Sequence, residues 1–372
     1  MILHIGKHDI PENIRNLPVV IYGGGYTGRI IFRLLSEDGV KISHIIDDNE
    51  KIHGEVFNNT EIISFHHFAD LYKDSGEVAV ILGTIYGKAV LSRLEKLPYV
   101  RVYELYEWYN ETCGMQQIFI DKVKNVSDVK RIRDNLKTLS PKWADGESQH
   151  VIDGLMKYID TRDINDIADV CTVDEHYFIP EVLDAVSRLG EGLRIVDGGA
   201  YWGELLQAMK RKKLSIEKWW CFEPDQENFD KLLRCCDSSM EGKQVCIRKG
   251  LWSSSGALYF EGGQGTASKI VDNETEEKID VVSIDDYFKD TRCNFIKMDF
   301  GNARAEYEAV MGSIQTIKRD RPILAISIDH GLDDLWRIPK YLMDRLDSYR
   351  YYVRHHSMIF CETVLYAIPG EE

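Results

Sequence analysis

Short apolar runs alternate with helix-like segments at both ends of this chain. In the N-terminal part, apolar runs cover residues 19–22, a segment that ends at Asp47 and Asp48, residues 77–84 and residues 99–105. The spacing of apolar positions predicts a helix over residues 29–35, soon after the first run. Strands that alternate with helices are typical of a parallel sheet. We therefore expect a small α/β domain over residues 1–115.

The C-terminal part holds a longer series of the same kind. Candidate strands cover residues 194–196, 219–222, 245–247, 294–298, 323–328, 350–354 and 363–367. Seven strands with helices between them predict a second α/β sheet over residues 176–369, whose last two strands form an antiparallel edge. A further β-rich stretch, residues 256–270, lies between the third and fourth candidate strands.

Residues 116–175 follow a different pattern. An apolar stripe recurs there at helical spacing, through Val123, Val126, Val129, Ile132 and Leu136. A helical pattern returns over residues 151–159, after a break at Pro141 and a polar run. We expect these residues to form a helical connector between the two α/β domains.

The first glycine-rich turn follows the apolar run at residues 19–22. Gly23, Gly25 and Gly28 match the pattern G-x-G-x-x-G, and Asp47 falls about 20 residues later. In a Rossmann-like βαβ unit such glycines let the backbone approach a nucleotide, and the acid accepts hydrogen bonds from its ribose. A docking or structural role for this turn stays open beside nucleotide binding.

The second glycine-rich turn has a different spacing. Asp197, Gly199 and Gly203 form D-x-G-x-x-x-G after an apolar run. Glu223 follows about 20 residues later, at the end of the next run, where an acid can accept hydrogen bonds from a ribose. Trp202 stands where G-x-G-x-x-G would have its last glycine, so the turn is not that of a dinucleotide site. The pattern favours S-adenosyl-L-methionine, which has no pyrophosphate, over an ordinary tight turn.

The net charge limits the partners. The 372 residues include 46 Lys and Arg against 61 Asp and Glu, a formal net charge of −15. This argues against a nucleic-acid partner, which requires clustered positive charge. The basic run at residues 210–213 falls at the expected end of the helix after the second turn, where cations suit the helix dipole.

Hydropathy and cysteine usage indicate the compartment. No apolar stretch reaches the roughly 20 residues of a membrane span, and no signal peptide is expected. The eight cysteines include no C-x-x-C pair, so we expect reduced thiols in a cytoplasmic protein and no zinc site. The oligomeric state, including a homo-oligomer, stays open.

A set of ordered segments gives a family resemblance over about residues 177–368. The segments are YFIPEVL, VDGGAYWGE, FEPDQENF, KGLWSSSGALYF, GTASKI, VVSIDDYF before FIKMD, AISIDHGLDDLWRIP, and YYVRHHS with ETVLYA. In this order they resemble the FkbM family of methyltransferases. The resemblance implies that the C-terminal domain is a seven-stranded class I methyltransferase domain of Rossmann-like α/β fold.

The resemblance also implies a function. We expect an S-adenosyl-L-methionine-dependent O-methyltransferase that acts on a hydroxyl of a glycan, a nucleotide-sugar or a related small-molecule metabolite. The N-terminal domain resembles the Rossmann-like domains that accompany bacterial sugar-modifying enzymes, which favours an acceptor in polysaccharide biosynthesis.

One segment departs from the family pattern. The family continues its fourth strand as D-I-E-G-A-E, whereas Asp299 is followed here by FGNARAEYEAV, with two extra residues. The carboxylate after Asp299 is therefore displaced or lost. A protein that binds cofactor or sugar nucleotide without turnover stays open, as does an NAD-dependent oxidoreductase that uses the N-terminal domain.

Polar residues at the ends of the later strands are the catalytic candidates. A sugar hydroxyl needs a general base or a metal, and histidine titrates near neutral pH. We expect His330 to be the base, Asp299 to orient it or to contact the cofactor, and Arg354 with His355 to hold the acceptor. The alternative is that His330 and His355 only form hydrogen bonds across strand ends.

Two further assignments complete the predicted site. Trp252 follows the third strand and is expected to flank the adenine, with core packing as the alternative. The expected site contains no metal, although Asp299, Asp329 and His330 could together hold Mg²⁺.

Overall fold

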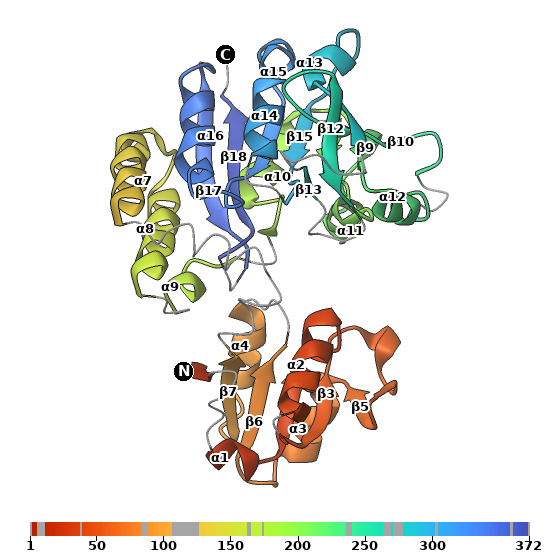
Figure 1. The fold of residues 1–372 in the computed structure, drawn as a ribbon, viewed down its shortest axis with the longest axis vertical. Helices are drawn as coiled ribbons and strands as arrows, with labels where there is room; N and C mark the ends of the chain where they lie inside the picture. The colour runs from red at the N-terminus through yellow and green to blue at the C-terminus, as the bar shows by residue number, and fades with distance from the viewer. Residues whose placement is uncertain are drawn as a thin grey trace. The chain divides into compact units, whose positions relative to one another are not determined.

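The computed structural model places the chain in two units, each with its own sheet (Figure 1). The described residues are 2–5, 12–37, 39–83, 88–105, 126–161, 165–172, 175–235, 240–262, 269–270, 278–301, 304–357 and 360–370. The N-terminal unit comprises Met1–Asp121, Asp163–Val173 and Ser357–Ile359. The C-terminal unit comprises Lys122–Arg162, Asp174–His356 and Phe360–Glu372.

A seven-stranded sheet forms the centre of the N-terminal unit. Its strands are β1 (Ile2–Ile5), β2 (Val19–Tyr22), β3 (Ile42–Ile46), β4 (Val56–Phe57), β5 (Thr60–Ile63), β6 (Val78–Leu82) and β7 (Val100–Leu105). The order is β1-β7-β6-β2-β3-β5-β4, and every pair is parallel except β4 with β5. From the adjacent strands β2 and β6, the chain continues to β3 on one side and to β7 on the other. These two strands therefore mark the topological switch point at which ligands bind in such sheets.

Helices cover both faces of this sheet. They are α1 (Glu12–Arg15), α2 (Tyr26–Glu37), α3 (Phe65–Tyr72) and α4 (Lys88–Glu95). The 3-10 helix η1 (Glu50–Ile52) and α9 (Asn165–Ala168) also belong to this unit. Val19 and Ile21 of β2 join a buried cluster with α2, whereas Val20 and Tyr22 join one with α3 and α4. Burial on both faces explains why β2 is apolar at successive positions.

The apolar pattern does not predict β1, β4 or β5. The strands β4 and β5 pair antiparallel and leave a two-residue turn of Asn58 and Asn59. Both asparagines have positive φ, 46° and 62°, as a type I′ hairpin turn requires. The Asn-Asn pair is therefore the sequence signal for this hairpin.

The C-terminal unit has a second seven-stranded sheet, in the order β10-β9-β8-β15-β16-β18-β17. Its strands are β8 (Leu193–Gly198), β9 (Ile216–Phe222), β10 (Gln244–Ile247), β15 (Phe295–Met298), β16 (Ile323–Ser327), β17 (Tyr349–His355) and β18 (Thr363–Pro369). All seven predicted strands are present. The expected antiparallel edge is confirmed, because β18 runs antiparallel to both β16 and β17.

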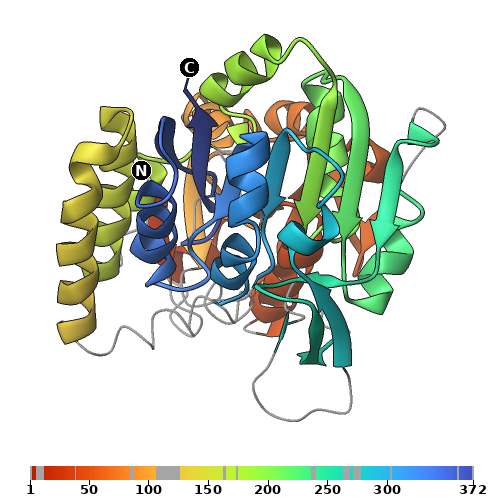
Figure 2. The ribbon, with the colours of Figure 1, turned by 90° about the horizontal axis from the view of Figure 1, so that it is seen from above.

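Helices also cover both faces of the C-terminal sheet (Figure 2). They are α10 (Pro180–Arg188), α11 (Glu204–Arg211), α12 (Gln226–Leu232), α13 (Ile284–Tyr287), α14 (Ala305–Met311), α15 (Ile314–Asp320) and α16 (Asp334–Met343). Val182 of α10 and Leu206 of α11 join Ile195 and Trp219 in one buried core. Within the described ranges, the structure contains no helix with the length and apolarity needed to cross a membrane.

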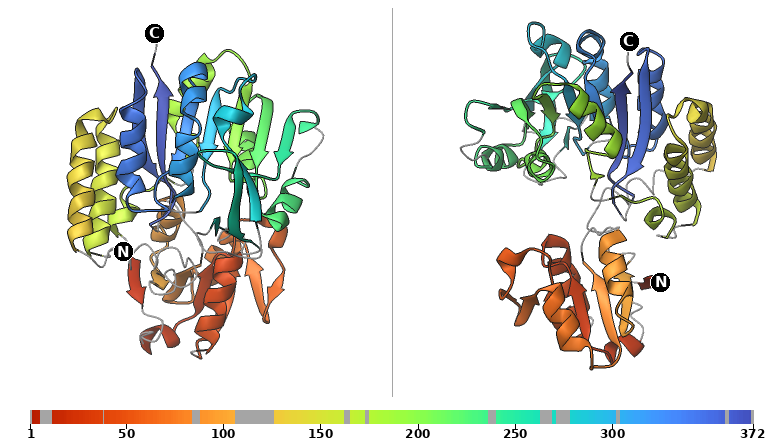
Figure 3. Two further views of the ribbon diagram at one scale, coloured as in Figure 1. Left: turned by 45° about the horizontal axis from the view of Figure 1, so that its top comes forward. Right: turned by 180° about the vertical axis from the view of Figure 1, so that it is seen from behind.

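A small four-stranded sheet accompanies the main sheet of this unit (Figure 3). Its strands are β11 (Gly250–Leu251), β12 (Gly256–Glu261), β13 (Lys269–Ile270) and β14 (Lys278–Val282), in the order β11-β14-β12-β13. Phe260, Ile279 and Val281 form its own buried cluster. Residues 263–268 of the predicted β-rich stretch lie outside the described residues.

The predicted connector is divided between the two units. The helices α7 (Val126–Leu139) and α8 (Gly146–Thr161), with the 3-10 helix η2 (Ser140–Lys142), belong to the C-terminal unit, and α9 belongs to the N-terminal unit. The amide of Ala144 donates to the carbonyl oxygen of Tyr351 at 2.8 Å, which joins the start of α8 to β17. The apolar face of α8 is thus buried in the C-terminal unit rather than in a separate connector. Residues 116–125 lie outside the described residues.

Candidate functional site

The carboxyl ends of β8, β9, β15 and β16 lie at one edge of the C-terminal sheet. The amino end of β18 lies there too, because β18 is antiparallel to its neighbours. Glu223, Asp299 and His330 follow these strand ends, and Asp197 is the penultimate residue of β8. Ligands of open α/β sheets bind outside this edge. The fold therefore gathers four of the sequence-predicted residues where a site is expected.

The glycine turn after β8 depends on close backbone approach. Gly199 has a φ of 69°, and a Cβ there would lie 1.9 Å from the carbonyl oxygen of Asp299. Gly203 has a φ of 97°, and its Cβ would lie 2.5 Å from Cys235 Sγ. A side chain at either position would be strained and would clash. These two glycines are thus required by the contact between the turn and its neighbouring segments.

Glu223 fixes the same turn from the end of β9. Its Oε2 accepts from the amide of Tyr201 at 2.9 Å, and its Oε1 accepts from the amide of Asp225 at 2.9 Å. Burial raises the pKa of Glu223 to about 7, although both backbone hydrogen bonds favour the charged form. Each carboxylate oxygen keeps a further lone pair, so the group can also accept from a ribose hydroxyl.

Asp197 lies beneath the turn rather than on its outer side. The side chain is fully buried and accepts from Trp219 Nε1 at 3.1 Å. Lys297 Nζ lies 3.3 Å from Asp197 Oδ1 and donates to the carbonyl oxygen of Gly199 at 2.8 Å. Burial raises the pKa of Asp197. We conclude that Asp197 supports the turn through Lys297, and the structure gives it no open face toward a ligand.

Lys297 was not among the residues that the sequence singled out. Burial disfavours its charged form, but Asp197 and Asp299 outweigh that effect and raise its pKa. The signal was present in the segment FIKM, where a lysine interrupts an apolar strand. A buried charge of this kind requires paired partners, and the glycine turn supplies them.

Asp299 follows β15 and is held by groups from several elements. Tyr177 Oη donates to Asp299 Oδ2 at 2.5 Å, and His330 Nε2 lies 3.5 Å from Asp299 Oδ1. Burial favours the neutral acid, but Lys297 and His330 outweigh it and hold the pKa of Asp299 below its usual range. Asp299 is therefore ionised and fixed in orientation at the strand end.

His330, the predicted general base, lies between two carboxylates. Its Nδ1 is 2.8 Å from Glu306 Oε1, and its Nε2 faces Asp299. Burial opposes the imidazolium, yet Glu306, Asp329 and Asp299 raise the pKa of His330 well above its usual value. The ring therefore carries a proton at neutral pH. It is placed to orient Asp299, and it is a poor proton acceptor.

The irregular segment after Asp299 returns a carboxylate to the strand end. The amide of Phe300 donates to Glu306 Oε1 at 2.6 Å, and the side chain of Glu306 is buried. The ring of Phe300 packs on the glycine turn, so a Cβ at Gly198 would lie 2.7 Å from it. The sequence analysis expected the carboxylate after Asp299 to be displaced or lost. The structure places such a carboxylate, that of Glu306, beside His330. Residues 302–303 lie outside the described residues.

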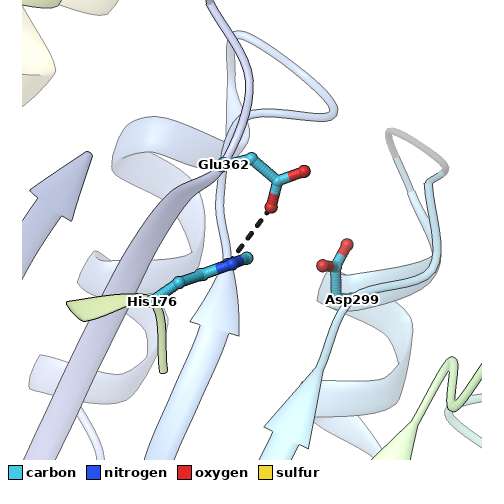
Figure 4. A group of neighbouring side chains, drawn as sticks. All are labelled: His176, Asp299 and Glu362. Carbon is cyan, nitrogen blue, oxygen red and sulfur yellow. Dashed lines mark ion pairs between the residues drawn. The ribbon is translucent and has the colours of Figure 1, made fainter. Parts of the chain in front are cut away.

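Two residues missed by the sequence interpretation complete this edge. His176 precedes α10, and its Nε2 lies 3.1 Å from Oε2 of Glu362, the residue before β18 (Figure 4). The ligand atoms of His176, Asp299 and Glu362 all lie within 4.8 Å of one another. No local sequence pattern identifies either residue, because the tertiary fold brings them to Asp299 from distant segments.

Arg354 and His355 are engaged away from Asp299. Arg354 is buried and donates to Asp145 and Ser148 at the start of α8 and to Glu181 of α10. His355 Nδ1 lies 2.8 Å from Thr363 Oγ1, its partner across the β17–β18 pair. These contacts correspond to the structural alternative for His355, and they leave Arg354 as a tie between β17 and two helices.

Asp329 and Trp252 also have defined surroundings. Asp329 is buried and accepts from Ser327 Oγ at 2.9 Å, and burial raises its pKa to about 7. The clusters of metal-ligating type among the described residues combine Asp299 with His176 and Glu362, or with Glu306 and His330, and Asp329 is in neither. Trp252 packs on the core of the small sheet, with the Arg304 guanidinium 5.6 Å from its ring centre.

The glycine turn of the N-terminal unit lies at the switch point of its sheet. Gly23 has a φ of 117°, and a Cβ at Gly28 would lie 1.7 Å from the carbonyl oxygen of Gly23. A Cβ at Gly25 would meet nothing within 4 Å. Asp47 Oδ2 accepts from the amide of Gly24 at 2.7 Å. The four predicted residues therefore gather around one turn, with Asp47 close to the glycines.

The strand order and the glycine turn after β8 define a class I methyltransferase sheet of Rossmann type. Residues 197–353 match the family model described as methyltransferase FkbM domain. This part of the chain is accordingly an FkbM methyltransferase domain, as the ordered sequence segments indicated. No curated protein matches the chain in sequence.

Solved structures give a fold-level comparison. A crystal structure of methyltransferase FkbM from Methylobacillus flagellatus is 21% identical, covers 97% of this chain and 94% of that chain, and has a TM-score of 0.57. UDP-D-quinovosamine 4-dehydrogenase from Vibrio fischeri is 24% identical over 23% of this chain and 75% of that chain, with a TM-score of 0.20. An rRNA methylase from Streptococcus thermophilus is 13% identical over 52% of this chain and 98% of that chain, with a TM-score of 0.33. The first comparison shows the fold alone, and the other two are too distant to indicate function.

Proposed function

We propose that the C-terminal unit is an S-adenosyl-L-methionine-dependent methyltransferase that acts on a hydroxyl oxygen. The observation that carries the proposal is the junction of the glycine turn with Glu223, whose carboxylate accepts from the Tyr201 amide at 2.9 Å within an FkbM methyltransferase domain. This junction joins the two groups that an adenosine ligand needs, a close backbone approach and a ribose acceptor.

The donor set at this edge fits the proposed cofactor. Glu223 would accept hydrogen bonds from the ribose hydroxyls. The backbone of the turn around Gly199 would pass close to the ligand. S-Adenosyl-L-methionine supplies a methyl group on a positively charged sulfur. Asp299 is ionised at the neighbouring strand end. Its negative charge complements the positive charge on the sulfur of the ligand.

A hydroxyl acceptor fits the acids of the site. In-line attack forms a bond between the hydroxyl oxygen and the methyl carbon, breaks the carbon–sulfur bond and leaves the electron pair on sulfur. The hydroxyl proton must leave in the same step or before it. The carboxylate of Glu362 is partly exposed, with a side-chain exposure of 32%, and can receive that proton. Positioning of acceptor and methyl group would supply much of the remaining rate enhancement.

His330 takes a different role in this proposal from the one its sequence position suggested. Both ring nitrogens face carboxylates, Glu306 on one side and Asp299 on the other. We assign it to positioning Asp299 rather than to proton removal. A glycan or a nucleotide-sugar is the proposed acceptor class, supported by the family resemblance of the sequence segments.

Cofactor binding is tested by calorimetry with S-adenosyl-L-homocysteine, the demethylated product, on the full chain. We expect the wild type to bind and Glu223→Ala to bind at least about tenfold more weakly, since a charged hydrogen-bond acceptor is lost. Glu217→Ala is the matched control. Glu217 is an exposed acid in the first half of β9, where it pairs with Arg194 of β8. An unchanged affinity in Glu223→Ala, or no binding by the wild type, would contradict the proposal.

A binding protein without turnover is the second candidate. The observation that favours it is the packing of the Phe300 ring on the glycine turn, in a segment that departs from the family pattern. Mass spectrometry of glycans and nucleotide-sugars from cells with and without the chain separates the two. A mass increase of one methyl group on a single acceptor, lost with the chain, supports catalysis. Identical spectra together with cofactor binding support the binding protein.

A further inference from the structure

Three side chains from separate segments converge beside the carboxyl end of β15. His176 comes from the loop before α10, Asp299 from the end of β15, and Glu362 from the residue before β18 (Figure 4). We propose that these three residues bind a divalent metal cation, which holds the acceptor hydroxyl for methyl transfer. The proposal rests on the proposed function for that last step, but not for the binding of the cation.

The distances suit one ion. His176 Nε2 and Glu362 Oε2 lie 3.1 Å apart, and all three ligand atoms lie within 4.8 Å of one another. With metal–ligand bonds of roughly 2.0–2.2 Å, two ligands of one ion lie about 3 Å apart when adjacent and just over 4 Å apart when opposite. The three groups therefore need only small movements to share an ion.

The neighbouring residues already fix the orientation of the ligands. Tyr177 Oη holds Asp299 Oδ2 at 2.5 Å. The other oxygen, Oδ1, is 3.5 Å from His330 Nε2, which is long for a hydrogen bond. The ring of His176 stacks on that of Tyr177, with centres 3.8 Å apart. Metal ligands are commonly oriented by such outer contacts.

The imidazole nitrogen at the centre of this group faces Glu362, and no described residue gives it a hydrogen bond. His176 Nε2 is buried, and despite its proximity to Glu362 it makes no hydrogen bond within the described part of the chain. A buried imidazole nitrogen without a hydrogen bond is unfavourable unless a ligand occupies it. A metal ion would satisfy this atom and both carboxylates together.

The backbone at the same place is strained. Tyr177 and Glu362 have φ values of 62° and 66°, in the left-handed region that residues other than glycine rarely adopt. Such strain costs of order 1–3 kcal/mol per residue and is maintained where the surrounding structure requires it. Here Tyr177 is the chain neighbour of His176, and Glu362 is itself one of the three proposed ligands.

The second cluster of similar composition is a weaker candidate. His330 Nδ1 and Glu306 Oε1 are already bonded at 2.8 Å, and Glu306 Oε1 also accepts from the amide of Phe300. Side-chain exposures there are 11% for His330 and 1% for Glu306, whereas His176 and Glu362 are 28% and 32% exposed. An ion with an open position for an acceptor fits the more accessible set.

The donor set indicates the kind of metal. One imidazole nitrogen and two carboxylates suit a cation that accepts both nitrogen and oxygen ligands, such as Mn²⁺ or Zn²⁺, better than a cation of oxygen preference alone. Three protein ligands leave coordination positions open, as catalytic sites do. With the ion bound, Asp299 and Glu362 are its ligands rather than proton acceptors. A hydroxyl bound to the ion has a lowered pKa, so its proton passes to water as the oxygen attacks the methyl carbon and the carbon–sulfur bond breaks.

The test is Mn²⁺ binding by the full chain after treatment with EDTA, without any cofactor. We expect calorimetry and electron paramagnetic resonance to show one site in the wild type. Glu362→Gln and His176→Gln should each weaken it by more than about tenfold, since even outer contacts of a metal site cost 10–100-fold. Circular dichroism establishes that each variant is folded.

Matched controls remove the same functional groups elsewhere. Glu217→Gln and His150→Gln change exposed residues outside the cluster, and both should bind Mn²⁺ as the wild type does. The proposal fails if the wild type binds none of Mn²⁺, Zn²⁺ and Mg²⁺. It also fails if folded Glu362→Gln binds Mn²⁺ with unchanged affinity.

The same variants separate this proposal from the proposed function. Glu362→Gln should keep its affinity for S-adenosyl-L-homocysteine, because its side chain is distinct from Glu223 and the glycine turn. Mn²⁺ binding without S-adenosyl-L-homocysteine binding in the wild type would refute the methyltransferase and keep the metal site. The reverse result would refute the metal site alone.

Discussion

The two units place a glycine turn at the same point of two similar sheets, yet they build it differently. In the N-terminal unit, Asp47 accepts from the amide of Gly24 in the turn and is partly exposed. In the C-terminal unit, Glu223 accepts from the amide of Tyr201 in the turn and is buried. In the N-terminal unit, the acid after β3 holds the turn that follows β2. In the C-terminal unit, the acid after β9 holds the turn that follows β8.

What lies beneath the turn distinguishes the two units. Lys297 in the C-terminal unit is buried and donates to the carbonyl oxygen of Gly199, with Asp197 as its counter-ion. In the N-terminal unit, the strand next to the turn, β6, is apolar throughout. The described clusters of metal-ligating type all belong to the C-terminal unit. The common backbone therefore provides a place for a ligand, and the side chains at the strand ends decide the chemistry.

The largest effect is expected from a methyl group in the C-terminal turn. Gly199→Ala places a Cβ 1.9 Å from the Asp299 carbonyl oxygen at a φ of 69°. We expect a loss of about 4 kcal/mol or more in the free energy of unfolding, or loss of cofactor binding where the turn shifts instead. Urea unfolding and calorimetry measure both quantities.

Gly25→Ala is the contrasting change in the N-terminal turn. A Cβ there meets nothing within 4 Å, so stability should change by less than about 0.5 kcal/mol. Equal effects of the two substitutions would show that the C-terminal turn does not depend on close approach.

A large effect is also expected from the buried cation. Lys297→Met leaves Asp197 charged without its partner, and the free energy of unfolding should fall by about 3–5 kcal/mol. The double variant with Asp197→Asn removes that unpaired charge and should recover part of the loss. Urea unfolding monitored by circular dichroism gives the comparison. A double variant as unstable as the sum of the single ones would contradict the pairing.

An intermediate effect is expected from pH at Glu223. Burial raises its pKa to about 7, and ribose hydroxyls donate to the ionised form. The affinity for S-adenosyl-L-homocysteine should therefore increase as pH rises from 6 to 8. Calorimetry at several pH values should show this dependence in the wild type and not in Glu223→Gln. A pH dependence retained in that variant would assign it to another group.

A small effect is expected from Asp47. Asp47→Ala removes the acceptor of the Gly24 and Asn49 amides, and we expect a loss of about 1 kcal/mol in the free energy of unfolding. Binding of S-adenosyl-L-homocysteine should remain unchanged, because that ligand is proposed for the other turn. A loss of that binding in the folded variant would place the cofactor in the N-terminal unit. Nucleotide binding by this unit, and with it the oxidoreductase alternative, stays a prediction that titration with NADH tests.

The fold was predictable in its strands because apolar runs and turn residues are local. The pattern indicates all seven strands of the C-terminal sheet, and it misses the Asn58-Asn59 hairpin, whose strands are too short to form a periodic pattern. The helices of residues 126–161 were predicted by their spacing. Their membership of the C-terminal unit was not, because it depends on contacts such as that of Ala144 with Tyr351.

The site was predictable only in part. Gly199, Gly203 and Glu223 lie in short motifs with fixed spacing, and the structure brings them together at one turn. Their role in cofactor binding stays a prediction. His330 was recognised as a polar residue at a strand end, but its pKa depends on Glu306, which a displaced segment brings back to it. Arg354 and His355 carry reactive groups, and their contacts with Asp145 and Thr363 engage them elsewhere.

The sequence by itself determined the strands of the C-terminal sheet, the two glycine turns and the methyltransferase family of the C-terminal part. These follow from local propensity and from motifs whose residues are close in the chain. Only the tertiary structure decided that Asp197 supports the turn, that Lys297 is its counter-ion, and that His176 and Glu362 meet at Asp299. Such contacts join residues more than 60 positions apart in the chain. Their chemistry depends on burial and on neighbouring charges, which no single segment carries.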